Sequence, residues 1–114
     1  MGIGSLFGRL MGGGAASTGF DAVKAAVENG SATIIDVREA HEFASGHIPG
    51  SINLPLSRFD PACVPTGKPV IAVCLSGARS GQATSICARA GREDVTNFTG
   101  GIAIWRLQGG TLIR

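Results

Sequence analysis

The sequence has 114 residues, 44% of them hydrophobic and 16% charged, with a formal net charge of +2. This length suits one domain rather than two, and the composition excludes a disordered chain. The small charge and the scattered basic residues argue against nucleic-acid binding, and no apolar run reaches the ~20 residues of a membrane span.

Residues 1–17 are predicted to be a flexible, glycine-rich leader. Five apolar residues in it have the i, i+3, i+4, i+7, i+8 spacing of a helical stripe: Ile3, Leu6, Phe7, Leu10 and Met11. Such a stripe could contact a membrane surface or a partner. Five glycines between Gly2 and Gly13 oppose it, because each costs a helix ~1 kcal/mol relative to alanine. We therefore expect a frayed terminus without membrane contact.

The folded domain is predicted to cover residues 18–114 and to alternate strands with helices. Thr18 and Asp21 resemble a capping box at the start of the first helix, and Gly30 is placed to end it. Short runs rich in β-branched residues predict the strands. The predicted helices cover residues 19–29, 39–45 and 80–90, with a short one that starts at Gly100 and carries Trp105. The predicted strands cover residues 32–37, 51–54, 70–73, 95–98 and 111–113.

This alternation predicts an α/β fold with a central parallel sheet of five strands, flanked by helices on both faces. Residues 70–73 are apolar on both faces, so their strand is expected at the centre, with residues 111–113 at an edge. In such sheets, ligands bind beyond the carboxyl ends of the strands. Cys74, which directly follows the central strand, is therefore the first candidate for a functional residue.

The loop after this strand contains residues that favour a reactive thiolate. From residue 74 to residue 80 it reads Cys-Leu-Ser-Gly-Ala-Arg-Ser. The thiolate is the nucleophilic form of cysteine, whose free pKa is about 8.5. Inward loop amides, the positive end of the next helix and Arg79 favour the anion, and Gly77 lets the backbone curl around the sulfur. A core cysteine is the alternative, but it would not need this loop.

Several stretches make the chain resemble the single-domain rhodaneses, a family of thiosulfate-type sulfurtransferases. They are Ile35 to Glu39, Glu42-Phe43, Gly46 to Pro55, the loop from Cys74 to Ser80, and Phe98 to Ile102 with Trp105. The resemblance runs from about residue 18 to the end of the chain. The order of the stretches makes it specific, and it implies a rhodanese-like fold.

The resemblance implies that Cys74 takes a sulfane sulfur from thiosulfate or another persulfide donor and becomes a persulfide. A thiophilic acceptor, such as cyanide or a thiol, then removes the sulfur, and a protein acceptor is an alternative. No cofactor or metal is expected, because the sequence has no motif for one. The resemblance implies that the sulfur is stabilised by the amides of five loop residues: Leu75, Ser76, Gly77, Ala78 and Arg79. It also implies that Arg79 attracts the donor. Ser80 is expected to cap the next helix, and its hydroxyl to add a hydrogen bond.

Two residues differ from other members of that family. Leu75 is apolar where thiosulfate-preferring members often carry a second basic residue. Glu42 lies where some two-domain members have a substrate-binding arginine. These differences predict that thiosulfate is a poor donor and that another persulfide is the physiological one.

The remaining candidates are assigned structural roles. Asp36 and Arg38 could shape the electrostatics near Cys74, but we favour an ion pair that fixes the loop. His47 is expected in a turn and not as a general base, since a catalytic dyad needs a histidine beside the nucleophile. Neither it nor His41 forms a metal-ligand cluster with the cysteines.

The other cysteines and the tryptophan are also interpreted structurally. Cys87 lies on the apolar face of its helix and is predicted to pack in the core. Trp105 is predicted to anchor the last helix. Cys63, in a proline-rich connection, could form a disulfide with a loaded Cys74, but we expect no role for it.

Two other functions use similar features. Phosphatases and arsenate reductases also place a cysteine in an anion-binding loop, but the phosphatase signature has five residues between cysteine and arginine, and here four separate Cys74 from Arg79. A persulfide carrier or binding module with little turnover remains an alternative. Three cysteines without a C-x-x-C pair, and no visible secretory signal, predict a cytoplasmic location. We expect a monomer or a weak dimer.

Overall fold

The computed structural model describes residues 16–114 of the chain. The predicted leader, residues 1–17, lies outside this range except for its last two residues. Ala16 and Ser17 already belong to the sheet, because the N–H of Asn97 donates to the carbonyl of Ala16 (2.7 Å) and Ser17 pairs with Asn97. The sheet therefore includes two residues that were predicted to belong to the leader.

Within residues 16–114, five parallel strands form one sheet in the order β1-β5-β4-β2-β3. They are β1 (Ser17–Thr18), β2 (Thr33–Asp36), β3 (Ile52–Asn53), β4 (Val70–Val73) and β5 (Val95–Phe98). All four residues of β4 are buried at the centre, as its apolar sequence predicts. The register places Asp36 opposite Val73, so the end of β2 lies beside the start of the Cys74 loop.

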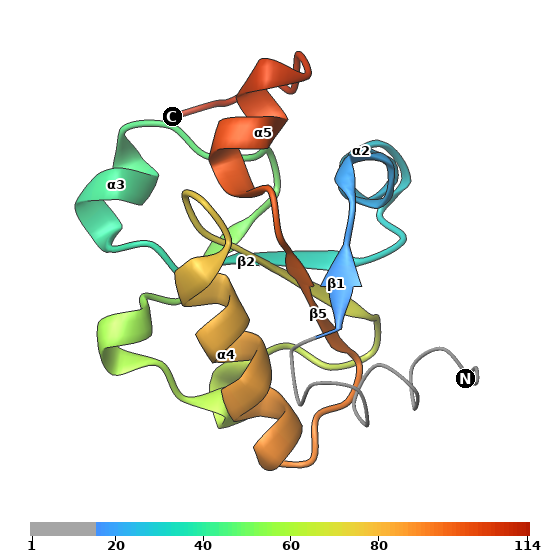
Figure 1. Cartoon of the computed structure of the whole chain (residues 1–114), viewed down its shortest axis with the longest axis vertical. Helices are drawn as coiled ribbons and strands as arrows, with labels where there is room; N and C mark the ends of the chain where they lie inside the picture. Colours follow the sequence, from blue (N-terminus) through green and yellow to red (C-terminus); the bar gives the residue numbers. More distant parts are fainter. Residues whose placement is uncertain (1–15) are drawn as a thin grey trace.

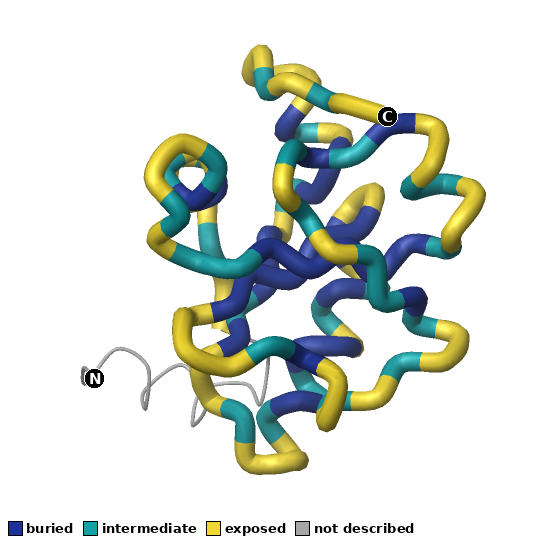
Figure 2. The backbone as a smooth tube through the Cα atoms, turned by 180° about the vertical axis from the view of Figure 1, so that it is seen from behind, coloured by how far each residue is buried: buried dark blue, intermediate teal, exposed yellow. Residues whose placement is uncertain are grey.

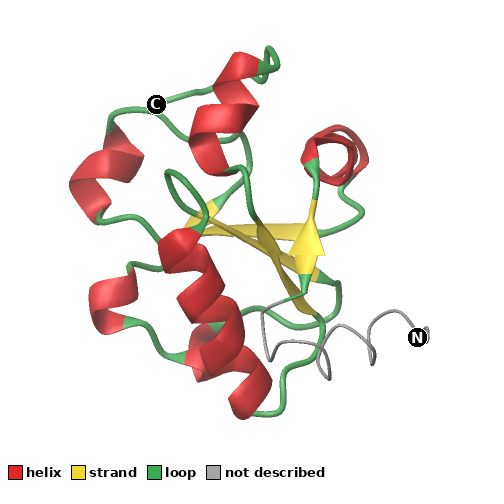
Figure 3. Cartoon of the chain, viewed as in Figure 1, coloured by secondary structure: helices red, strands yellow, loops and turns green. Residues whose placement is uncertain are grey.

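Helices cover both faces of the sheet, which confirms the predicted α/β architecture (Figures 1 and 3). They are α2 (Phe20–Asn29), α3 (Ala40–Ala44), α4 (Ala78–Arg89) and α5 (Gly101–Leu107), with the 3₁₀ turns η1 (Leu56–Arg58) and η2 (Pro61–Cys63). α2 and α5 pack on one face, and α4 packs on the other with the two 3₁₀ turns. Within residues 16–114, no helix is both long and apolar enough to cross a membrane.

Alternate residues of each strand supply the cores on the two faces. Ile34 of β2 belongs to the cluster under α2 and α5, and its neighbour Ile35 belongs to the cluster under α4. The strands form the buried centre of the domain (Figure 2). Trp105 is a core anchor, as predicted: it is 3% exposed, its ring lies 5.1 Å from that of Phe20, and its indole N–H donates to the carbonyl of Thr111.

The predicted capping box before the first helix is wrong. Thr18 belongs to β1, where its hydroxyl hydrogen-bonds to the hydroxyl of Thr96. Gly19 occupies the N-cap of α2 instead, and a glycine has no side chain to cap with. At the other end Gly30 stops the helix as predicted, with a positive φ of 70°.

The fifth strand of the sheet is β1 and not the predicted strand at residues 111–113. Ile113 instead forms an isolated antiparallel bridge with His47. β1 has two polar residues and no apolar run, so no local pattern marks it as a strand. Its pairing with β5 becomes visible only once the rest of the sheet is assembled.

Candidate active site

Cys74 lies at the carboxyl end of the central strand, where β4 passes into the loop before α4. Its side chain is 1% exposed and packs in the cluster under α4. The N–H of Gly77 donates to Cys74 Sγ at 3.1 Å, and the hydroxyl of Ser80 lies 3.3 Å from the same atom. The sulfur is therefore both buried and in contact with polar hydrogens.

These contacts favour the thiolate form of Cys74. Burial by itself would raise the pKa of the thiol, because it removes water from the charged form. Hydrogen bonds from the Ser80 hydroxyl and from the amides of Ser80, Gly77 and Ser76 outweigh this effect, and the pKa lies below its ordinary value. The predicted stabilisation by loop amides thus has a structural basis at Ser76 and Gly77, and it extends to the amide of Ser80.

The first turn of α5 and the residues just before it hold the loop in this shape. The N–H of Ile102 donates to the carbonyl of Cys74 (2.9 Å), and that of Ala103 donates to the carbonyl of Leu75 (3.1 Å). Two glycines allow the close approach. Gly77 has a φ of 101° and a Cβ there would lie 2.3 Å from the carbonyl oxygen of Thr99. Gly101 has a φ of 62°, and its Cβ would lie 2.4 Å from the carbonyl oxygen of Leu75.

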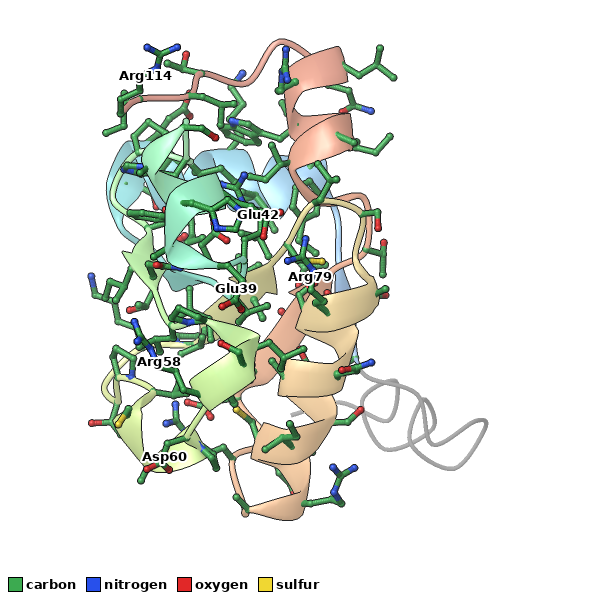
Figure 4. All side chains as sticks on the ribbon, turned by 90° about the vertical axis from the view of Figure 1, so that its left-hand side faces the viewer. Glu39, Glu42, Arg58, Asp60, Arg79 and Arg114 are labelled. Atoms are coloured by element: carbon green, nitrogen blue, oxygen red, sulfur yellow. The ribbon has the colours of Figure 1, made fainter. Side chains whose placement is uncertain are left out.

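Arg79 is held by Glu42 of α3 in a two-pronged ion pair (Figure 4). The guanidinium nitrogens lie 2.7 and 3.0 Å from the two carboxylate oxygens. The hydrogen bond from Arg79 lowers the pKa of Glu42 to about 2, and the pKa of Arg79 is raised by the same contact. Both groups therefore stay charged at neutral pH, and the positive charge at the loop is neutralised within the protein.

Asp36 and Arg38 form a buried ion pair at the end of β2. The Arg38 guanidinium donates to the Asp36 carboxylate at 2.8 Å and to the carbonyl of Gly46 at 2.7 Å. The side-chain amide of Asn53 donates to the carbonyls of both residues. The ion pair that we favour for Asp36 and Arg38 is therefore present, and it ties the end of β2 to the segment after α3 and to β3.

Ser80 does not cap α4, contrary to the prediction. α4 begins at Ala78 with Gly77 at its N-cap, so Ser80 lies in the first turn with its side chain fully buried. The hydrogen bond predicted from its hydroxyl is present, since this group faces the sulfur. On the outside of the loop, Leu75 is 49% exposed, and Ser76 and Ala78 are also exposed.

Asn97 of β5 is a site residue that the sequence analysis missed. Its side-chain N–H donates to the carbonyl of Gly77 (3.0 Å), and its side-chain oxygen accepts the hydroxyl of Ser80 (2.5 Å). The residue is 7% exposed. A polar side chain in a short buried strand was the available signal, because a buried amide needs partners. Its partners, however, come from a distant loop and helix.

Comparison with known proteins places this architecture in a family. The sequence profile of the rhodanese-like domain matches residues 20–108, from the start of α2 to just past α5, and includes the whole Cys74 loop. The chain belongs to the rhodanese-like domain family. A solved structure of a rhodanese-related protein from Thermoplasma volcanium superimposes with a TM-score of 0.76 at 27% identity, covering 86% of this chain and 97% of that one.

Rhodanese-like relatives are also found among curated proteins. Thiosulfate sulfurtransferase GlpE of Stutzerimonas stutzeri is 34% identical over 83 residues, which are 71% of this chain and 76% of that protein. The uncharacterized protein YqhL of Bacillus subtilis is 40% identical over 76 residues, 65% of this chain and 60% of its own length. A Synechocystis relative that is 38% identical matches over 44% of its length. The chain thus spans only about half the length of these last two relatives.

Of the remaining candidates of this rhodanese-like domain, Cys87 has the position predicted for it, whereas His47 lies in the isolated bridge with Ile113 and not in a turn. His47 stacks on Phe43 with ring centroids 3.7 Å apart, and its Nδ1 lies 2.9 Å from the carbonyl of Phe43. Cys87 is buried in the core, and burial raises its pKa. Cys63 is an exposed free thiol. The redox role considered for it stays untested.

Proposed function

We propose that this rhodanese-like domain is a sulfurtransferase that carries a sulfane sulfur on Cys74 as a persulfide. The observation that carries the proposal is the polar surrounding of a buried sulfur, with the Gly77 amide and the Ser80 hydroxyl within hydrogen-bonding distance of Sγ. This surrounding lowers the pKa of Cys74 and so supplies the nucleophile. Sulfurtransferase relatives, GlpE among them, support the same chemistry.

The reaction has two displacements. The Cys74 thiolate attacks the terminal sulfur of the donor, the donor's S–S bond breaks, and its electron pair leaves with the remainder of the donor, which is sulfite when the donor is thiosulfate. The new Sγ–S bond leaves the negative charge on the outer sulfur, where loop amides can stabilise it. A thiophilic acceptor then attacks this outer sulfur, and Cys74 returns as a thiolate. With cyanide as acceptor, the product is thiocyanate.

The charges at the loop favour a persulfide donor over thiosulfate. The Arg79 guanidinium is already neutralised by Glu42, and Arg38 is buried with Asp36. The exposed residue after the nucleophile is Leu75, which offers no charge to a dianion. In a persulfide of a thiol, the group that carries the transferred sulfur has less charge near the site of attack than thiosulfate has. Its reaction with Cys74 therefore depends less on a free cation at the loop.

We expect Glu42→Gln to raise kcat/KM for thiosulfate relative to kcat/KM for glutathione persulfide. The substitution frees the charge of Arg79, and a partly exposed charge contact is worth up to about 1 kcal/mol, which is about fivefold in this ratio. Both constants would be measured by steady-state kinetics at low ionic strength. Glu28→Gln, which removes the same charge from an exposed position on α2, is the matched control. A ratio that moves equally in both variants would contradict the role of Glu42.

Sulfur loading tests the proposed function directly. Intact-protein mass would be measured before and after incubation with thiosulfate and with glutathione persulfide, followed by cyanide. We expect a gain of one sulfur atom that cyanide removes, mapped to the peptide that contains Cys74. Loading together with thiocyanate formation would support a sulfurtransferase that turns over. Loading without turnover would favour the carrier alternative, and no loading from either donor would overturn persulfide chemistry at this site.

A further inference from the structure

The Ser80 hydroxyl has two hydrogen-bonding neighbours but only one proton. Its oxygen lies 2.5 Å from Oδ1 of Asn97 and 3.3 Å from Sγ of Cys74. A hydroxyl can donate to one acceptor at a time. Ser80, Cys74 and Asn97 are all buried, so water does not readily take the place of a lost partner.

The orientation of the Asn97 amide is set by Gly77. Its nitrogen lies 3.0 Å from the carbonyl oxygen of Gly77, which can only accept. Rotating the amide by half a turn would bring two carbonyl oxygens together at this contact. Oδ1 therefore faces Ser80, and because this oxygen can only accept, the Ser80 proton can be directed to it as well as to Sγ.

This arrangement suits a sulfur that carries a proton or a second sulfur. With its own proton directed to Asn97, the Ser80 oxygen presents a lone pair to Cys74 and can accept the S–H of a thiol. A thiolate instead needs a donor, and hydrogen bonds to a charged acceptor are about twice as strong as neutral ones. In a persulfide the charge moves to the outer sulfur, and Sγ no longer competes for the Ser80 proton.

We propose that the Ser80 hydroxyl is a two-position donor, which donates to Cys74 Sγ in the thiolate and to Asn97 Oδ1 in the thiol and the persulfide. Asn97 is then a positioning residue that keeps the buried hydroxyl satisfied whenever Sγ is uncharged. On ionisation the thiol proton leaves to solvent and the Ser80 proton turns to the sulfur. The inference rests on the proposed function for its persulfide state, whereas its thiol and thiolate states do not depend on it.

Asn97 therefore competes with the thiolate for the Ser80 proton, and its removal should make Cys74 more acidic. The charged groups near the loop are Arg79, paired with Glu42, and the Asp36–Arg38 pair at the end of β2. The sequence from residue 95 to residue 105, in β5 and α5, has no Asp, Glu, Lys, Arg or His. Changing Asn97 leaves all these charges in place, so their effect on the thiol is constant across the variants.

A double-mutant cycle on Asn97 and Ser80 tests the proposal in the full chain. The pKa of Cys74 would be taken from the pH dependence of iodoacetamide alkylation, in a Cys63→Ser background that removes the exposed thiol. Asn97→Leu fills the space of the amide so that water cannot replace it, and Asn97→Ala is the second variant should leucine disturb folding, which circular dichroism would show. Each is measured with Ser80 present and in the Ser80→Ala protein.

We expect Ser80→Ala to raise the pKa of Cys74, because the thiolate loses a donor. The effect of Asn97 is the pKa of Cys74 after its removal minus the pKa before. We expect this effect to be more negative with Ser80 present than in the Ser80→Ala protein, by about half a unit to one unit. That difference corresponds to the free energy of one neutral hydrogen bond. This difference separates the effect of Asn97 on the pKa of Cys74 that depends on Ser80 from any effect that depends on Gly77. Equal changes in the two backgrounds, or a difference of the opposite sign, would overturn the proposal. The cycle uses no sulfur donor, so its failure is distinct from a failure of sulfur loading.

Discussion

Cys74→Ser is expected to abolish sulfur transfer while the domain remains folded. A serine hydroxyl has no accessible anion at neutral pH and cannot form a persulfide, so thiocyanate formation should fall below detection with every donor. The serine oxygen can still accept the N–H of Gly77, which keeps the buried polar group paired. We therefore expect the free energy of unfolding to change by no more than about 1–2 kcal/mol.

Thiocyanate formation and thermal unfolding followed by circular dichroism measure the two effects. Cys63→Ser is the matched control, because it removes an exposed thiol that lies outside the Cys74 loop. It should load and transfer sulfur like the natural chain. Retained turnover in Cys74→Ser would refute the mechanism, and a loss of turnover in Cys63→Ser would show that the exposed thiol takes part after all.

Gly77→Ala should nearly eliminate sulfur loading even though Cys74 is unchanged. A Cβ at this position would lie 2.3 Å from the carbonyl oxygen of Thr99, and the backbone has a φ of 101° that alanine rarely adopts. The loop must move away from Thr99, and it takes with it the amide that donates to Cys74 Sγ. A displacement of about 1 Å at a reacting group can cost about 100-fold in rate. Backbone strain and the clash together should cost roughly 2–4 kcal/mol of stability.

Gly67→Ala separates the clash from the backbone strain. Gly67 also has a φ of 101°, but its Cβ would have no atom within 4 Å. This control should lose about 1–2 kcal/mol of stability and load sulfur at the rate of the natural chain. The rate of persulfide formation, followed by mass, and chemical denaturation distinguish the two. If both variants load at the same rate, the close packing of Gly77 against Thr99 is not needed for catalysis.

The order of elements and the position of the nucleophile were predictable because short-range signals encode them. The four apolar residues of β4 and the small residues after them predict a buried strand that ends at Cys74. Glycine also marks chain reversals locally, so Gly30 correctly indicated the end of α2. The resemblance to the single-domain rhodaneses added the fold family, which the match over residues 20–108 confirms.

Other features depend on residues that are far apart in the chain. The ion pair between Arg79 and Glu42 spans 37 positions, and the contact of Asn97 with Gly77 spans 20. No local pattern relates such residues, because they meet only after the parallel strands align. β1 is similar, since its two polar residues become a strand through pairing with β5.

The sequence by itself thus determined that a cysteine ends a central parallel strand in a tight, glycine-containing loop. Hydrophobic runs and glycine conformations are properties of a few adjacent residues, so they can be read without a structure. The tertiary structure alone decided which groups surround the sulfur and which charges remain free. It showed that Ser80 faces Cys74 instead of capping a helix, that Glu42 neutralises Arg79, and that Asn97 supports the loop from β5. Each depends on packing between separate elements, which sets distances that sequence spacing does not.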